Sequence, residues 1–494
     1  TLTDAPPVTL AYDQAGRLNK EQLSDEVARQ IEYDADSQPV AQRVLQGELP
    51  LFSTGYRYDR RGNMTRRSDS LWGDDGYHYD AVGRLLAHTD PQAYIHRFIQ
   101  DATGNRMTHR VHTVDTSPEG WYREGHYNDT RYLFDRAGNL CQRRYTDGSR
   151  QAFIWDESQQ LIAVRCGDNV THYAYDGLGR RVCKQTVRET RWFYWQGDAL
   201  LAEVSAPGYP PLQPLALYDV AGRLKRQKAQ AALFNNLREY VYYPGSFYPF
   251  ALLTQQEGER NSYHYHCDPN GMPLRLTAGN GEIVWSQRCG VWGEPGEVYA
   301  SQIDNPLRFQ GQYFDAETGL HYNRYRYYCP QTGSYISQDP IRLNGGLNLY
   351  RYAPNPLGWV DPLGLIIVYR NLRPDEDIDK GISARLPGRG MTPGGHVRNG
   401  SKETFKGSQY ISTTVDSAVT DHWRKPGQRT IMFDTDDVIP DSTGERKIID
   451  VSTEAKAQAA GLKPPATHYA ANSREVLVVG RIERSKLTIV CGGD

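Results

Sequence analysis

The sequence lacks the patterns that define disulfide-rich, zinc-binding and membrane-spanning proteins. Its seven cysteines are scattered and no Cys-x-x-Cys occurs, which argues against a disulfide framework or structural zinc and favours a chain made in a reducing cytoplasm. No apolar run reaches the roughly 18 to 20 residues that span a bilayer, so we expect no stable membrane insertion. His264, His266 and Cys267 are the only local group of metal-ligand types. Their spacing fits the alternating side chains of a strand better than a metal site, and we predict no metal.

The chain also lacks a large net charge of either sign, because its formal net charge is −2 at pH 7. The chain as a whole therefore gives no indication of a nucleic-acid or anionic-membrane partner. Methionine is scarce, with 5 residues, whereas 46 Gly, 28 Pro and 34 Tyr indicate a turn-rich chain with an aromatic core. The sequence begins Thr1-Leu2 and enters a repeat at once. We therefore expect a fragment or processed product, with any targeting segment upstream.

A Tyr-Asp repeat dominates the first half of the chain. The pattern aromatic-Asp-x-x-Gly-Arg occurs at Tyr12-Asp13, Tyr79-Asp80, Tyr175-Asp176 and Tyr218-Asp219. The repeat aspartates stand at positions 13, 34, 59, 80, 101, 135, 156 and 176, so most steps are 20 or 21 residues. Such a period is typical of one supersecondary unit repeated many times. The long step from 101 to 135 indicates an insertion.

Each repeat predicts a strand, a turn and a strand. Alternation such as Tyr77-x-Tyr79 puts aromatic rings on one face, Asp opens a turn, and the Gly four residues after the Tyr supplies a positive φ. A lone hairpin is marginal in water, so the units must stack and bury a shared face. We therefore predict a mostly β fold in which one long sheet winds through the repeats.

The segment after the repeats resembles a known family. From Asn305 the chain reads NPLRFQGQYFDAETGLHYNRYRYY, followed by SQDP at 337–340, GGLNLY at 345–350 and NPLGWVDPLGL at 355–365. This resembles the core-associated segment of bacterial RHS/YD-repeat polymorphic toxins. The resemblance implies a YD-repeat β-cocoon shell over residues 1–304, a plug with an aspartyl autoprotease over 305–365, and a variable toxin domain over 366–494.

The resemblance also implies a cut after Asp-Pro-x-Gly-Leu, which places it between Leu365 and Ile366. Asp339-Pro340 and Asp361-Pro362 stand 22 residues apart, the spacing that the family uses. Paired carboxylates suit this chemistry, because two that lie close together share a proton, so one serves as base and the other as acid. Asp339 and Asp361 are therefore the predicted catalytic pair, although Asp-Pro is also a common turn start.

Cations near the pair would assist the cut. Arg324 and Arg326 could each hold an acid ionised or polarise the scissile carbonyl, and the sequence does not choose between them. The sequence departs from the family pattern at two places. Ile341-Arg342 follows the first Asp-Pro, where the fuller family pattern has Gly in the fourth place. Cys329-Pro330 stands where family members commonly have Asp-Pro.

Beyond Leu365 the repeat stops, and a small α+β domain is predicted. Residues 366–494 hold 19 Lys and Arg against 17 Asp and Glu, so overall charge does not mark a nucleic-acid binder. Helix-compatible runs occur at 417–423 and 455–460. Strands ending in Arg370, containing Ser412-Thr413-Thr414, and opening at Glu475 follow one another in order. This order resembles the mono-ADP-ribosyltransferase toxins of the Arg-Ser-Glu class.

That second resemblance implies NAD as a substrate. Arg370 would bind its phosphates, Ser412, Thr413 and Thr414 would hold the nicotinamide cleft, and Glu475 would stabilise the oxocarbenium ion as nicotinamide departs. Ser473 stands where arginine-modifying members have Glu or Gln, so the acceptor stays open between a protein side chain and RNA.

Two alternatives stay open. The same shell could carry a nuclease, although His396, His422 and His468 are far apart in sequence, or the chain could be a structural YD-repeat protein without activity. The leading hypothesis is a secreted effector that is made in the bacterial cytoplasm and acts in the cytoplasm of a target cell. Its expected partners are a cognate immunity protein, secretion-apparatus or chaperone proteins, with delivery such as type VI secretion, and the target macromolecule.

Overall fold

The fold is known from a computed structural model of the chain. It describes residues 8–81, 83–111, 120–207, 236–244, 246–256, 258–340, 348–353, 355–358 and 360–364. In the C-terminal part it describes Leu462, Ala466 and the strands β30–β38 named below. The chain divides into two compact units. The first comprises Thr1–Tyr243, Phe247–Gln338 and Asn348–Gly364, and the second Pro244–Ser246, Asp339–Leu347 and Leu365–Asp494.

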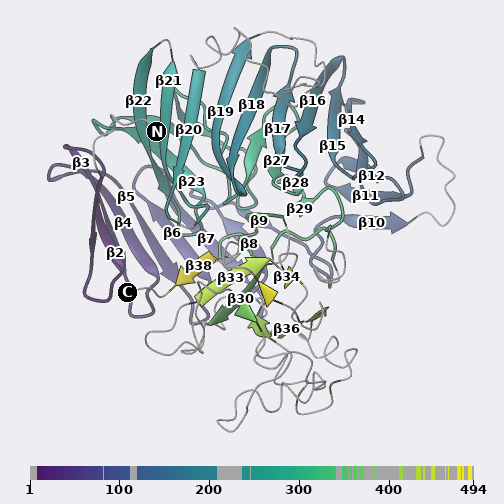
Figure 1. Cartoon of the computed structure of the whole chain (residues 1–494). Helices are drawn as coiled ribbons and strands as arrows, with labels where there is room; N and C mark the ends of the chain where they lie inside the picture. Colours follow the sequence, from purple (N-terminus) through teal and green to yellow (C-terminus); the bar gives the residue numbers. More distant parts are fainter. Residues whose placement is uncertain are drawn as a thin grey trace. The chain divides into compact units, whose positions relative to one another are not determined.

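The first unit contains two long antiparallel sheets, in which each strand pairs with its neighbour in sequence (Figure 1). Among the described residues, the first sheet has nine strands: β1 (Thr9–Tyr12), β2 (Leu18–Gln22), β3 (Val27–Tyr33), β4 (Pro39–Gln46), β5 (Leu49–Tyr58), β6 (Met64–Asp69), β7 (Gly73–Tyr79), β8 (Leu85–Thr89) and β9 (Ile95–Arg97).

The second sheet has sixteen strands within the described ranges: β10 (Thr108–Val111), β11 (Arg123–Tyr127), β12 (Thr130–Phe134), β13 (Leu140–Arg144), β14 (Arg150–Trp155), β15 (Leu161–Cys166), β16 (Asn169–Tyr175), β17 (Arg181–Gln185), β18 (Glu189–Gln196), β19 (Ala199–Pro207), β20 (Asn236–Tyr242), β21 (Pro249–Gln256), β22 (Glu259–Cys267), β23 (Pro273–Ala278), β24 (Ile283–Gln287) and β25 (Val298–Ser301). The break between the sheets lies between Arg97 and Thr108, around the Asp101 turn at which the long step begins. We call β1–β25 the shell.

In most repeat turns the aspartate and a glycine close the turn, and Ser37 and Gln159 take the place of the glycine after Asp34 and Asp156. At Asp80, the backbone N–H donates to the Arg84 carbonyl at 3.0 Å, and Oδ1 accepts the Arg84 N–H at 2.8 Å. Gly83 has φ +80° and donates its N–H to the Asp80 carbonyl at 3.1 Å. An L residue rarely adopts this φ, which explains why Gly recurs there.

The repeat aromatics tie each turn to the turn before it. Tyr79 donates its hydroxyl to the Met64 carbonyl at 2.7 Å, and Trp155 donates its indole N–H to the Leu140 carbonyl at 2.8 Å. The same bond recurs from Tyr33 to Leu18, Tyr58 to Pro39, Tyr175 to Leu161 and Trp195 to Arg181. The step of about 20 residues is therefore the distance along the chain from one such bond to the next.

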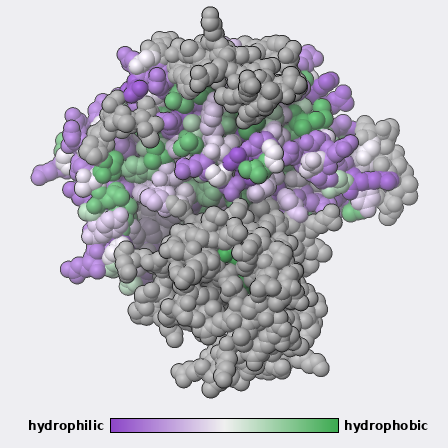
Figure 2. Space-filling model, in the orientation of Figure 1, coloured by the Kyte–Doolittle hydropathy of each residue, from purple (hydrophilic) through white to green (hydrophobic). Residues whose placement is uncertain are grey.

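One face of the shell strands is packed. Along β5, Phe52, Thr54 and Tyr56 are buried, and the residues between them are partly exposed, as the alternation of a half-buried strand requires. Figure 2 shows the described surface on its visible face as hydrophilic with separate hydrophobic patches. The apolar rings of the repeats therefore stabilise the unit from within.

Within the first unit, the described residues 305–338, 348–353, 355–358 and 360–364 form a plug that packs against the shell. It contains β26 (Tyr313–Asp315), β27 (Leu320–Asn323), β28 (Arg326–Cys329) and β29 (Ser334–Tyr335) in one antiparallel sheet. Shell and plug share one hydrophobic core, in which Phe153 and Tyr173 of the shell belong to the same cluster as Tyr313 and Leu320 of the plug.

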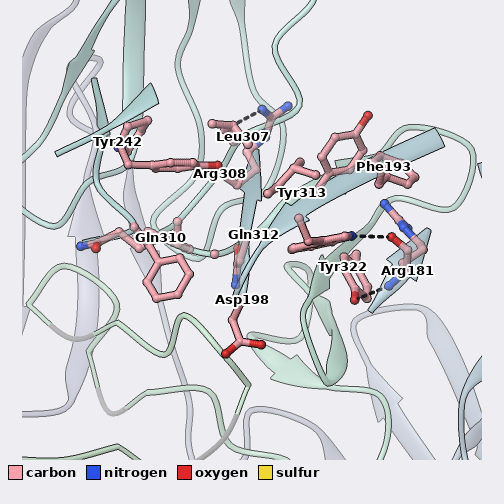
Figure 3. A pocket seen from close by; sticks show the side chains of 16 residues that line it. Arg181, Phe193, Asp198, Tyr242, Leu307, Arg308, Gln310, Gln312, Tyr313 and Tyr322 are labelled. Carbon is pink, nitrogen blue, oxygen red and sulfur yellow. Dashed lines mark hydrogen bonds between the residues drawn. The ribbon is translucent and has the colours of Figure 1, made fainter. Parts of the chain in front are cut away.

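A buried arginine joins the shell to the plug. The Arg181 guanidinium donates to the Asp315 carboxylate at 2.5 Å. It lies 4.4 Å from the ring centre of Tyr322 and 4.7 Å from that of Phe193, and Figure 3 shows these three side chains. Lys184 lies 3.3 Å from the same carboxylate. Burial acts to raise the pKa of Asp315, but the charges of Arg181 and Lys184 and their hydrogen bonds hold it below its usual value.

The described strands of the second unit form two sheets. They are β30 (Ile367–Asn371), β31 (Ile382–Ser383), β32 (Ile411–Thr414), β33 (Thr430–Asp434), β34 (Val438–Ile439), β35 (Lys447–Asp450), β36 (Glu475–Val479), β37 (Arg481–Ile482) and β38 (Thr488–Cys491). The larger sheet has the order β35-β36-β32-β30-β33-β38 and the smaller one β31-β37-β34.

The expected fold class, mostly β with a YD-repeat shell, is confirmed. Ala466 is the single helical residue that the structure describes, and the helix-compatible runs at 417–423 and 455–460 lie outside the described residues. Within the described residues, no helix has the length and hydropathy of a membrane span.

Candidate functional site

The carboxylate of Asp361 is buried near the end of the plug, four residues before Leu365. Its Oδ1 accepts the Gly364 N–H at 2.9 Å, and its Oδ2 accepts the Tyr335 hydroxyl at 2.9 Å. Arg326 Nη2 lies 3.4 Å from the same Oδ2. All three groups are donors, and donors stabilise the ionised form of a carboxylate. We call Asn323, Arg326, Tyr335, Asp361 and Gly364 the Asp361 cluster.

Arg326 connects this carboxylate to the backbone just before the predicted cut. Its Nε donates to the Gly364 carbonyl, and its guanidinium carbon lies 3.6 Å from the ring centre of Tyr335. Gly364 has φ +75°, and a Cβ at this position would lie 2.8 Å from the Asn323 carbonyl oxygen. Both the conformation and the close approach therefore require glycine.

Asn323 and Tyr335 complete the cluster, and neither is predicted from the sequence. Asn323 Nδ2 donates to the Tyr335 hydroxyl at 2.7 Å and to the Asp361 backbone carbonyl at 2.8 Å. Burial, and then the negative charge of Asp361, raise the pKa of Tyr335 well above its usual value, so the hydroxyl keeps its proton. Residues separated by 26 and 38 positions meet here, and no local pattern signals such contacts.

The two predicted support arginines lie in different surroundings. Arg326 reaches Asp361, whereas Arg324 donates to Asp198 of the shell at 2.7 Å and to the Leu178 carbonyl at 2.9 Å. Arg324 has φ +54° and stands in the two-residue turn between β27 and β28. Of this pair, Arg326 is therefore the arginine that the structure brings to Asp361.

The remaining autoprotease residues are described in part. Asp339 is buried, but it belongs to the second unit, and its pairing with Asp361 stays a prediction. Leu365 and Ile366 lie outside the described residues. Cys329 is fully buried and lies 3.3 Å from Arg143 Nη2 of the shell, so its side chain contacts the shell.

The histidines of β22 are held by the sheet. His266 Nε2 lies 2.9 Å from Thr277 Oγ1, and burial lowers the pKa of His266 well below its usual value. Burial likewise lowers the pKa of His264 to about 4. Over the described part of the chain, no group of three His, Cys, Asp or Glu side chains could hold a metal ion.

In the second unit, the predicted NAD-site residues stand on three neighbouring strands. Tyr369, beside Arg370 on β30, is opposite Thr414 on β32, and Thr414 is opposite Glu475 on β36. The register also pairs Ser412 with Leu477 and Thr413 with Val476. Thr413 is buried. The sheet thus places Arg370 and Glu475 on the two strands that flank Ser412–Thr414.

A row of strand-turn-strand repeats packed on an internal plug, with an ionisable cluster at the plug's end, defines a YD-repeat shell protein. The family described as RHS protein matches residues 263–299, and the family described as Teneurin YD-shell matches residues 1–117.

Two curated relatives extend this match. The chain is 34% identical over 375 residues to Double-stranded DNA deaminase toxin A of Burkholderia cenocepacia (strain H111), covering 71% of this chain and 25% of the relative. It is 30% identical over 388 residues to Probable deoxyribonuclease RhsA of Dickeya dadantii (strain 3937), covering 74% of this chain and 24% of the relative. The chain therefore spans about a quarter of the length of these relatives.

A solved structure is also similar, the crystal structure of TcdB2-TccC3-TEV. It is 18% identical with a TM-score of 0.49, covering 74% of this chain and 20% of that one. The chain is therefore similar to RHS proteins over residues 263–299, to YD-shell proteins over residues 1–117, and to toxins over about three quarters of its length.

The prediction of an NAD-dependent mono-ADP-ribosyltransferase is wrong. The relatives described above are named for action on DNA, as a deaminase and a deoxyribonuclease. The error has a physical origin, because an Arg at a strand end, a Ser-Thr-Thr strand and a Glu at a strand start are ordinary parts of a small antiparallel sheet. Their order along the chain does not specify an NAD site.

Proposed function

We propose that this chain is the C-terminal part of a secreted toxin, which releases residues 366–494 by cutting itself between Leu365 and Ile366. The Asp361 cluster carries this proposal. A buried carboxylate that accepts the Gly364 N–H, beside an arginine that binds the Gly364 carbonyl, fixes the backbone one residue before the cut. A carboxylate held so close to a peptide bond is placed for acid-base chemistry on it.

In the proposed reaction, Asp361 and Asp339 act as a pair. One carboxylate takes a proton from water, and the water oxygen attacks the Leu365 carbonyl carbon. The other carboxyl gives its proton to the departing nitrogen as the C–N bond breaks. Leu365 is left with a new carboxyl group and Ile366 with a free amine. Arg326 keeps the preceding peptide in place.

Substitution of each aspartate tests the pair. Asp339→Asn and Asp361→Asn should each leave a chain of full length on a denaturing gel, whereas the unmutated chain should give two fragments. Asp198→Asn is the matched control, because Asp198 binds Arg324 and not Arg326, and this variant should cut normally. An uncut unmutated chain would refute the proposal.

The released domain is proposed to act on nucleic acid in the target cell. The names of the two relatives support this choice. The register of three neighbouring strands places Arg370 and Glu475 on the two strands that flank Ser412–Thr414, and Glu475 is the carboxylate whose removal we use as the test.

Expression of residues 366–494 in bacteria tests this part. We expect loss of viability with damaged or altered DNA or RNA, and Glu475→Gln should reduce the toxic activity on the order of 10²-fold or more. The same extracts are also incubated with labelled NAD, to test for transfer of the label to a macromolecule. Transfer of label to a macromolecule with intact nucleic acids would contradict the proposal.

A cognate immunity protein and secretion or chaperone proteins are the proposed partners, and toxin names among the relatives support them. Co-expression of a gene that encodes the cognate immunity protein, sought first among small neighbouring open reading frames, should protect a host that expresses residues 366–494. An unrelated small protein is the control.

A further inference from the structure

We infer that Asp361 is the ionised member of the aspartate pair, and that Tyr335 and Asn323 are positioning residues that hold it in that state. The inference rests on the proposed self-cleavage and deepens it. It assigns the base to Asp361 and the acid to Asp339, a choice that a pair of carboxylates leaves open.

The direction of the hydrogen bonds supports this assignment. An amide Nδ2 can only donate, so the Tyr335 oxygen is the acceptor in its 2.7 Å bond with Asn323. The Tyr335 proton is then available for Asp361 Oδ2 at 2.9 Å. Asn323 also donates to the Asp361 backbone carbonyl. The amide thus fixes both the orientation of the hydroxyl and the position of the aspartate.

Two further contacts of the carboxylate act in the same direction. Gly364 offers a backbone N–H to Oδ1, and the Arg326 guanidinium offers a charge to Oδ2. Backbone N–H and guanidinium groups cannot accept a proton from a carboxylic acid. Each contact therefore gains strength when Asp361 is ionised, as a charge-assisted hydrogen bond does.

This state determines the role of Asp361 in the cut. An ionised Asp361 takes a proton from the attacking water as the oxygen–carbon bond forms at Leu365. Asp339 enters the step protonated and gives its proton to the Ile366 nitrogen as the C–N bond breaks. The two carboxyl groups exchange protonation states over one turnover, and one water is consumed.

The pH profile of cutting by the whole chain tests the inference. Chain 1–494 is made in a short cell-free pulse, quenched in guanidinium while uncut, and refolded by dilution into buffers from pH 3 to pH 8. Tyr335→Phe removes only the hydroxyl. Without this donor, Asp361 protonates more readily. The acidic limb of the rate profile should therefore shift to higher pH, by about one unit.

Tyr328→Phe is the matched control. Tyr328 is equally buried and on a neighbouring plug strand, but its hydroxyl donates to the Trp292 carbonyl at 2.9 Å. Its profile should overlay that of the unmutated chain. A Tyr335→Phe profile that also overlays it would overturn the inference and leave self-cleavage standing. No cutting by the unmutated chain would instead overturn the proposed function, and the inference with it.

A second substitution tests the same hydroxyl independently, in case Tyr335→Phe does not fold. Fluorotyrosine placed at position 335 keeps the hydroxyl and makes it a stronger donor, so the acidic limb should move to lower pH. A limb that does not move, or moves up, would contradict the inference.

Discussion

At the scale of residues, the join between shell and plug depends on buried charges. Arg181 and Asp315 are both almost completely buried, and the aromatic rings around the guanidinium belong to shell and plug alike. Removing one partner of a buried ion pair leaves the other charge without compensation. Arg181→Ala should therefore lower the free energy of unfolding by about 3–5 kcal/mol in urea titrations.

Arg43→Ala is the control for this prediction. Arg43 pairs with Glu32, and the two side chains are 45% and 52% exposed, so solvent screens the pair. We expect little change. An equal loss for both variants would show that the buried pair has no special role.

Asp268 should make the shell sensitive to pH. Burial raises the pKa of this carboxyl to about 7, against the opposing charge of Arg67. Because an unfolded Asp has a pKa near 3.9, ionising the folded form costs free energy that grows between about pH 4 and pH 7. Asn at this position can still accept the Met272 N–H. Asp268→Asn should stabilise the protein by on the order of 2–3 kcal/mol more at pH 8 than at pH 5.

Asp59 occupies the same turn position as Asp268, but its effect on stability should depend on pH in the opposite direction. Burial acts to raise its pKa, but hydrogen bonds from Asn63 and Arg61 outweigh burial and hold the pKa below the usual value. Its ionised form therefore contributes stability above about pH 4, which is lost as pH falls through the folded pKa. Asp59→Asn should be destabilising at pH 8. If Asp59→Asn and Asp268→Asn changed the stability at pH 8 in the same direction, the opposite signs assigned to the two carboxyls would be wrong.

Part of the residue-scale picture could be predicted from the sequence, and part could not. The turns were predictable because Asp80 and Gly83 act on their own neighbours. The choice between Arg324 and Arg326 was not, since alternation along a strand would place both side chains on one face. The positive φ of Arg324 breaks this alternation. Tyr335 was missed because only the tertiary fold brings it to Asp361.

At the scale of elements, the turn at 361–364 must keep its shape for the cut to occur. Gly364→Ala would force a strained φ and place a methyl group 2.8 Å from the Asn323 carbonyl. We expect this variant to lose most of its cutting, measured as the uncut fraction on a denaturing gel. The control Gly358→Ala adds a methyl group at ordinary contact distance, 3.7 Å from Asn355 Nδ2, and should cut. Normal cutting by Gly364→Ala would contradict the role of the turn.

At the scale of the whole molecule, the cut should leave the shell and plug intact. Their shared core and the Arg181–Asp315 pair all lie before Leu365, so breaking the 365–366 bond removes none of these contacts. If the shell also encloses its cargo, both fragments should co-elute in native size-exclusion chromatography and separate only in denaturant. Separation under native conditions would count against enclosure.

The central claim is that the chain cuts itself after Leu365 by means of Asp361. Intact-mass spectrometry of purified chain 1–494 tests it most directly. We expect two species, residues 1–365 and residues 366–494, whose masses add up to the full chain plus one water, and a single uncut species for Asp361→Asn. An uncut wild-type chain, or an Asp361→Asn chain cut at the same bond, would contradict self-cleavage by Asp361.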